Sequence, residues 1–194
     1  MKAVQLSFTS LNASPRLFDS STLLTVATLA YSAAWSQILG QSIEFFPQLT
    51  TDEKIGFVTG GYTQPSLPCV GTIGGIERLG FDGLCFSDGP AGHSQSDGVS
   101  VLASGITVAE TWDRDLMYKR AVVIGEEFRA KGARVHLGPS LRPLGRHALG
   151  GRNWESFGPD PYLAGVAMSA SVQGIQSISV QACSKHYIGN EQET

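Results

Sequence analysis

Polar side chains follow three short apolar segments of the sequence, each at the point where the segment ends. Asp88 comes after residues 84–86, and Lys185-His186 comes one residue after 180–183. A third apolar segment, 135–137, precedes a glycine-rich stretch with three arginines, Arg142, Arg146 and Arg152. A carboxylate beside cationic donors can pair with neighbouring hydroxyl groups of a sugar, each charge-assisted hydrogen bond contributing roughly 1.5–3 kcal/mol. A phosphate would suit the cations but not the carboxylate.

Structural explanations remain open for the same residues. An Asp at the start of a turn often bonds its own backbone, so Asp88 could simply cap the Gly-Pro turn that follows it. Lys-His is a common dipeptide, but burying it without partners would cost several kcal/mol. Lys185 and His186 are therefore expected to face a polar cleft.

Helical patterns lie between these apolar segments. Residues 113–131 have the spacing of an amphipathic helix, with Asp113 as its cap and Gly132 as its end. Its apolar face consists of Met117, Ala121, Ile124 and Phe128. A second helix is expected to begin at Asp160-Pro161, and another near residues 50–54.

Apolar segments that alternate with helices predict a parallel sheet of βαβ units, either a barrel or a doubly wound sheet. The expected strands cover 84–86, 135–137 and 180–183, whereas the glycine-rich segment 60–75 is expected to be a long loop. Because the carboxyl ends of parallel strands face the ligand, Asp88 and the Lys185-His186 pair should meet at one edge.

Composition and motifs exclude several partners and cofactors. The net charge is −3 and the pI about 5.8, so no broad basic surface is expected to bind nucleic acid. The sequence has neither a G-x-G-x-x-G nor a Walker pattern, and its three cysteines lack zinc-binding spacing. We therefore expect neither a cofactor nor a metal.

An apolar stretch near the start of the chain, 23–34, follows Arg16 and ends in small residues. These features indicate a secretory signal segment, with a disordered leader or an amphipathic helix as alternatives. The stretch is shorter than the roughly 20 apolar residues that a membrane span needs. No membrane contact is expected.

The cysteines differ in their expected states. Cys69 and Cys85 are close enough in sequence to bridge a short loop, and the residues alone leave open whether they do. Cys183 lies in an apolar run, which favours a buried, unreactive thiol.

The nine residues from Lys185 to Glu193 (Lys-His-Tyr-Ile-Gly-Asn-Glu-Gln-Glu) resemble the Lys-His segment of family-three glycoside hydrolases of the fungal β-glucosidase type. Five further segments also match the family and occur in the same order. These segments are 84–90, 109–114, 137–139, 150–155 and 157–162. The resemblance covers about 50–194, which leaves 1–49 as a leader with a possible signal segment and a first helix.

The resemblance implies an α/β fold, the N-terminal part of a (β/α)8 TIM-like barrel, and a sugar pocket. It implies that the pocket holds the non-reducing glucose of a β-glucoside or cello-oligosaccharide, and that Trp154 and Glu155 brace Arg152. The implied binding residues are Asp88, Arg152, Lys185 and His186. The resemblance also implies a Cys69–Cys85 bridge and secretion, because the two cysteines resemble a short-loop disulfide pair of fungal members.

The chain departs from the family at the edge of the implied pocket. His93-Ser94 stands where members often have a basic residue, and Ala103-Ser104 replaces a Phe-Pro pair. The apolar run 147–149 replaces a more polar stretch before Gly-Gly-Arg. The resemblance therefore carries over to the first sugar only.

The resemblance also implies that the nucleophilic Asp and the acid/base Glu belong to a missing C-terminal part of the same enzyme. A retaining glycosidase needs these two carboxyl groups about 5 Å apart. Glu126-Glu127 is interpreted as the solvated side of its helix, and Glu191 and Glu193 as too near the chain end to be held in place. We expect a fragment of a retaining β-glucosidase without turnover, or alternatively a non-catalytic or vestigial sugar-binding protein.

Overall fold

The computed structural model describes residues 33–60, 69–142, 144, 147–187 and 189–193. The chain divides into two compact units, Met1–Thr51 and Asp52–Thr194. In the first unit, helix α2 (Ala33–Phe45) runs into a short 3-10 helix, η1 (Phe46–Gln48). The helix ends there because Pro47 cannot donate a backbone hydrogen bond. Residues 23–32 of the candidate signal segment lie outside the described residues.

The second unit contains a mixed sheet with the strand order β1-β2-β3-β4. Its strands are β1 (Gly71–Ile73), β2 (Leu84–Asp88), β3 (Val135–Leu137) and β4 (Gln181–Ala182). Strands β2, β3 and β4 are parallel, as predicted, and β1 is antiparallel to β2. The prediction of one long loop over 60–75 is wrong, because β1 lies within it. A three-residue strand is too short to show an alternating pattern.

Two long helices connect the parallel strands. Helix α5 (Arg114–Ala130) leads from β2 to β3, and α6 (Pro161–Ser177) leads from β3 to β4. Each has an Asp at its N-cap: Asp113 accepts from the Leu116 amide at 3.0 Å, and Asp160 accepts from the Leu163 amide at 2.7 Å. Two shorter helices are α3 (Thr51–Thr59) and α4 (Gly105–Ala109). Short 3-10 turns are η2 (Glu77–Leu79) and η3 (Asn153–Glu155).

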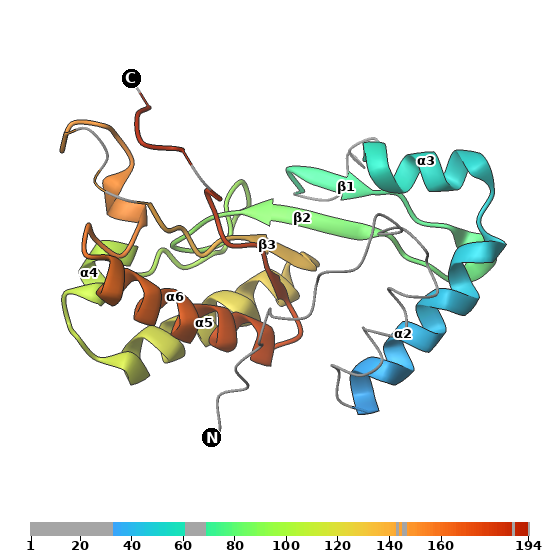
Figure 1. Ribbon diagram of the computed structural model, residues 1–194, viewed down its shortest axis with the longest axis horizontal. Helices are drawn as coiled ribbons and strands as arrows, with labels where there is room; N and C mark the ends of the chain where they lie inside the picture. Colours follow the sequence, from blue (N-terminus) through green and yellow to red (C-terminus); the bar gives the residue numbers. More distant parts are fainter. Residues whose placement is uncertain (1–32, 61–68, 143, 145–146, 188, 194) are drawn as a thin grey trace, which may run out of the picture. The chain divides into compact units, whose positions relative to one another are not determined.

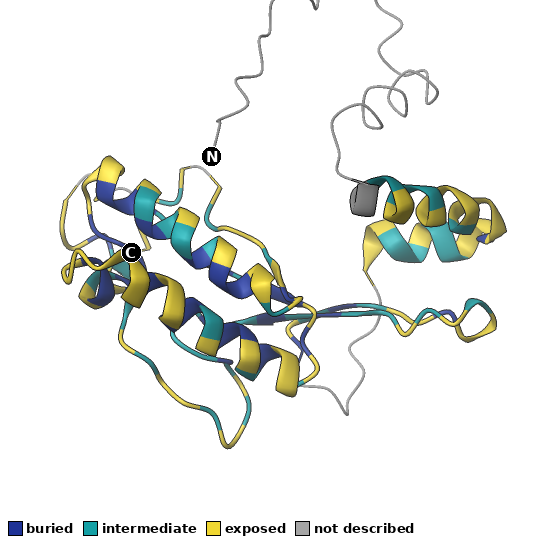
Figure 2. Ribbon diagram, turned by 90° about the horizontal axis from the view of Figure 1, so that it is seen from below, coloured by how far each residue is buried: buried dark blue, intermediate teal, exposed yellow. Residues whose placement is uncertain are grey.

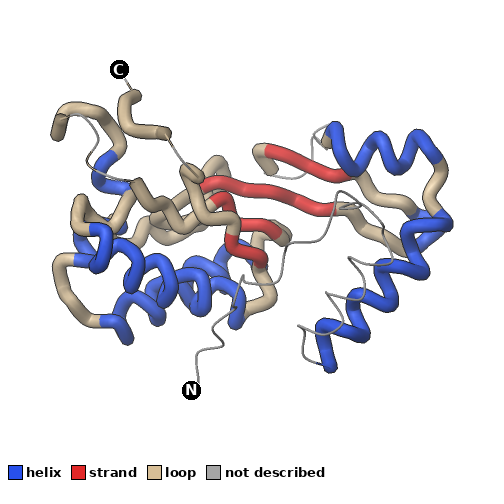
Figure 3. The backbone as a smooth tube through the Cα atoms, in the orientation of Figure 1, coloured by secondary structure: helices blue, strands red, loops and turns tan. Residues whose placement is uncertain are grey.

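Helices α5 and α6 lie on the same face of the sheet (Figures 1 and 3). The order β2-β3-β4 follows the sequence without a reversal, so both right-handed crossovers lead to the same side. A doubly wound sheet would instead reverse its strand order and place helices on both faces. The described strands therefore have singly wound topology.

The core lies between these helices and the sheet. The predicted apolar face of α5 is confirmed, since Met117, Ala121, Ile124 and Phe128 are each at most 1% exposed. In Figure 2 the long helices carry buried residues along one side and exposed residues along the other. A Cβ at Gly174 would lie 2.7 Å from the Ala121 Cβ, so only glycine permits this close approach of α6 to α5.

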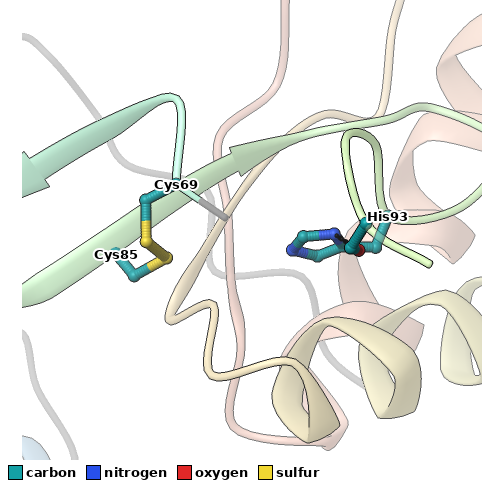
Figure 4. Close-up of a disulfide and its surroundings, with 4 residues drawn as sticks. Cys69, Cys85 and His93 are labelled. Carbon is teal, nitrogen blue, oxygen red and sulfur yellow. Dashed lines mark hydrogen bonds between the residues drawn. A yellow bond between two sulfur atoms is a disulfide. The ribbon is translucent and has the colours of Figure 1, made fainter. Parts of the chain in front are cut away.

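A disulfide joins Cys69 to Cys85 across 16 residues, with a Cα–Cα distance of 5.4 Å (Figure 4). It ties the residues before β1 to the middle of β2, and both cysteines belong to the core cluster around Phe128. Cys183, in contrast, is free and exposed, so the prediction of a buried thiol is wrong. It follows β4, the last strand in the described sheet order, where no further strand of the described chain covers it.

Candidate functional site

Asp88 and Lys185 meet at the carboxyl edge of the parallel strands, as the sequence predicts. Asp88 is the last residue of β2, and Lys185 follows β4 and is guided there by a hydrogen bond of 3.0 Å from its amide to the Pro139 carbonyl. Lys185 Nζ donates to Asp88 Oδ1 at 2.5 Å. The Gly89 amide donates to the same oxygen at 2.9 Å. Asp88 thus caps its own turn and also takes part in the cluster, so both interpretations apply.

The cations near Asp88 stabilise its negative charge. Burial raises the pKa of the Asp88 carboxyl, but other contacts lower it more strongly, and the net pKa lies below its ordinary value. These contacts are the hydrogen bond and charge of Lys185, the Gly89 amide and the charge of Arg152. Asp88 is therefore an ionised acceptor at neutral pH, with its side chain 41% exposed to solvent.

Arg152 is held rigidly by a neighbouring carboxylate. Its Nε donates to Glu155 Oε1 at 2.6 Å and its Nη2 donates to Glu155 Oε2 at 2.9 Å, a two-pronged contact that fixes the guanidinium plane. Glu155 is only 7% exposed, whereas the Arg152 side chain is 38% exposed. The hydrogen bond to Glu155 raises the pKa of Arg152. The remaining nitrogen, Nη1, lies 3.4 Å from Glu193 Oε1.

Trp154 lies on the same turn, η3, with its side chain half exposed. Within the described parts of the chain, Glu155 braces Arg152 through hydrogen bonds and Trp154 does not. A bracing role for Trp154 stays a prediction.

His186 follows Lys185 through a cis peptide bond and is partly buried. Its Nδ1 is buried and has no hydrogen-bond partner among the described residues. Burial lowers the pKa of His186 below its ordinary value, and the charges of Lys185 and Arg152 lower it further. The ring is therefore neutral at neutral pH.

Two other arginines were candidates from the sequence, Arg142 and Arg146. Arg142 is 3% exposed, and its Nη1 donates to the Gly151 carbonyl at 2.6 Å, which supports the turn before Arg152. Arg146 lies outside the described residues.

The interpretation of Glu127 as solvated is wrong, because its carboxylate accepts from the amides of His93 and Ser100 at 3.1 and 2.6 Å.

His136 is a residue that sequence reasoning missed. It is 1% exposed in β3, and its Nε2 lies 3.0 Å from the Gly89 carbonyl, directly after Asp88. A carbonyl oxygen only accepts, so the ring proton is on Nε2. Burial lowers the pKa of His136 to about 4. The signal in the sequence was a titratable residue inside a short apolar strand.

The described residues contain no group of three or more His, Cys, Asp or Glu side chains placed to hold a metal ion. Nor do they include a helix that is long and apolar enough to cross a membrane.

Taken together, the fold and the site define an α/β protein with a charged, sugar-compatible cluster at the carboxyl edge of its parallel strands. Residues 91–194 match the glycosyl hydrolase family 3 N terminal domain. This chain belongs to glycosyl hydrolase family 3.

Named relatives and solved structures agree with this assignment. The "Probable beta-glucosidase G" of Aspergillus flavus is 54% identical over 163 residues, which are 84% of this chain and 20% of that protein. The Chaetomium thermophilum β-glucosidase structure has a TM-score of 0.76 at 48% identity, with 84% of this chain and 19% of that chain covered. The chain spans about a fifth of the length of the curated relatives it matches.

A further relative has been solved with a sugar. The β-glucosidase 3B of Thermotoga neapolitana, in complex with α-D-glucose, has a TM-score of 0.71 at 32% identity. The similarity covers 79% of this chain and 24% of that one.

Proposed function

We propose that this chain is the sugar-binding portion of a retaining β-glucosidase and that it holds a terminal glucose of a β-glucoside or cello-oligosaccharide. The observation that carries the proposal is the cluster of Asp88, Lys185 and Arg152 at the carboxyl edge of the sheet. An ionised carboxylate can accept from one sugar hydroxyl, while the two partly buried cations beside it donate to neighbouring hydroxyls. His186, which follows Lys185 and is partly buried, is the fourth proposed binding residue.

The proposed architecture is the N-terminal part of a (β/α)8 barrel. Strands that are added in sequence order, with both crossover helices on one face, are the arrangement that continued addition closes into a barrel. A barrel typically requires about 250 residues, so the remaining strands would come from a C-terminal part of the same enzyme.

The chain alone is proposed to bind without cleaving. Retaining hydrolysis needs a free nucleophilic carboxylate and a carboxylic acid about 5 Å apart. The carboxylates of the cluster are already engaged by cations: Asp88 by Lys185, Glu155 by Arg152, and Glu193 by Arg152. Both oxygens of Glu155 are engaged in this way, and one oxygen each of Asp88 and Glu193.

The proposed location is extracellular. The Cys69–Cys85 disulfide supports it, because such bonds persist mainly in oxidising compartments.

A single assay tests both halves of the proposal. Saturation-transfer NMR with nitrophenyl β-glucoside should give binding signals from the glucose ring, while nitrophenol absorbance stays at the level without protein. Absence of ring signals would contradict the binding half. Nitrophenol release that disappears in Asp88→Ala would contradict the absence of turnover.

A further inference from the structure

The loop that follows Asp88, residues 89–103, leads from β2 toward α4 and folds back on itself. The Leu102 amide donates to the Ala91 carbonyl at 2.8 Å, which closes the loop at its base. Within it, Gly92 passes so close to Ser100 that a Cβ at Gly92 would lie 2.2 Å from the Ser100 carbonyl oxygen. The loop is thus a compact unit whose first residue adjoins the site carboxylate.

One face of α5 binds this loop through charged side chains. Arg120, Glu127 and Lys131 are separated by seven and four residues, so they lie on the same side of the helix and its C-cap. Arg120 donates to the carbonyls of Pro90 and Ala103, both at 2.7 Å, and Lys131 donates to the Asp97 carbonyl at 2.5 Å.

Glu127 supplies the acceptors in this set. Its Oε2 accepts from the His93 amide at 3.1 Å and its Oε1 accepts from the Ser100 amide at 2.6 Å, so one carboxylate joins the two limbs of the loop. The amide next to His93, that of Ser94, donates to the Asp88 carbonyl at 2.9 Å. The consecutive amides of His93 and Ser94 therefore connect Glu127 to the backbone of Asp88.

Aromatic packing supports the same contact. The buried His93 ring lies 4.8 Å from the Phe128 ring, next to Glu127 on α5 (Figure 4 shows His93 on its loop). The Phe128 ring in turn lies 4.4 Å from the His136 ring, centroid to centroid, and His136 contacts the Gly89 carbonyl.

We propose that Glu127 is a positioning residue for Asp88: by holding the 89–103 loop on α5, it fixes the carboxylate that receives the sugar. The inference rests on the proposed sugar-binding function and extends it to a residue that contacts no ligand. Glu126 provides a matched comparison, because it is the neighbouring glutamate, is exposed, and has none of these loop contacts.

The test compares Glu127→Gln with Glu126→Gln in the 194-residue chain. A Gln side chain keeps one acceptor oxygen and turns an amide donor toward the second loop amide, so it breaks one of the two contacts. Hydrogen exchange of the Ser94 and Leu102 amides, which do not bind Glu127 directly, should be roughly tenfold faster in Glu127→Gln only. The Kd for glucose, from NMR titration, should rise roughly three- to tenfold in Glu127→Gln only.

A purely structural role would change thermal stability without this local pattern, so the circular dichroism melting curve is recorded for each variant. Glu127→Asp keeps both acceptor oxygens and should recover part of the Ser94 protection and of the affinity. It also provides the comparison if Glu127→Gln does not fold.

The outcomes separate the two proposals. Equal Ser94 exchange in Glu127→Gln and Glu126→Gln overturns the positioning role, and so does faster exchange with an unchanged Kd for glucose. If the unsubstituted chain binds no glucose, the proposed function fails, and the Ser94 exchange still decides whether Glu127 holds the loop.

Discussion

Lys185 Nζ lies 2.5 Å from Asp88 Oδ1, although 97 residues separate the two in the sequence. Asp88 ends β2 and Lys185 follows β4, so β3 and both crossover helices must be in place before they meet. Each residue therefore depends on the complete parallel sheet for its position, and their separation measures whether the sheet is assembled.

The Asp88–Lys185 pair should contribute little to stability. The Asp88 side chain is 41% exposed, so water screens the attraction, and a double-mutant cycle with Asp88→Asn and Lys185→Met should give a coupling of about 1 kcal/mol or less. Urea unfolding of the four proteins measures it. A coupling above about 3 kcal/mol would mean that the pair is structural rather than poised for a ligand.

The Cys69–Cys85 disulfide should contribute much more. Replacing both cysteines by Ser frees the loop of 16 residues that they close, and we expect a loss of about 3 kcal/mol in unfolding free energy. The control is Cys183→Ser, whose exposed thiol closes no loop and should change the value by less than about 0.5 kcal/mol. Similar losses in the two proteins would show that the disulfide is not the source of this stability.

His136 should make the chain less stable as the pH falls. Its pKa is about 4 in the folded state and 6.5 as the ordinary value, so the unfolded chain binds more protons between these limits. The stabilisation is complete above pH 6.5 and is lost as the pH falls toward about 4, at up to roughly 1.4 kcal/mol per pH unit.

The check is urea unfolding at several pH values for the unsubstituted chain and for His136→Gln. Gln can donate to the Gly89 carbonyl but does not titrate, so the slope between pH 6.5 and 4 should decrease. An unchanged slope would show that other groups, such as His93, account for the acid sensitivity.

Glu155 should affect sugar binding through Arg152. Glu155→Gln removes the charge and one acceptor of the two-pronged contact, so Arg152 should lose its fixed orientation and the Kd for glucose should rise roughly tenfold. Glu191→Gln, an exposed change later in the chain, is the control for NMR titration. Equal Kd values for the two variants would show that the orientation of Arg152 by Glu155 does not affect sugar binding.

Local sequence rules predicted the elements whose signals are local. Asp113 and Asp160 cap their helices, and the buried face of α5 follows its helical spacing. The meeting of Asp88 and Lys185 followed from a general property of parallel strands. In each case the relevant physics acts within one element or is shared by all sheets of this type.

The sequence could not predict features that depend on distant partners. Glu127 has the pattern of a solvated helix residue, and only the folded 89–103 loop brings the amides of His93 and Ser100 to its carboxylate. Strand β1 exists because β2 offers it a backbone edge. The exposure of Cys183 likewise depends on which strands lie beside β4, a tertiary property that an apolar run does not encode.

The central claim is that the Asp88 cluster binds a sugar, and NMR titration of the 194-residue chain with glucose tests it most directly. The unsubstituted chain and Asp82→Ala, a matched change at an exposed aspartate before β2, should both give saturable shifts. Asp88→Ala should bind at least roughly tenfold more weakly. No saturable shift in the unsubstituted chain, or equal affinity in Asp88→Ala and Asp82→Ala, would contradict the claim.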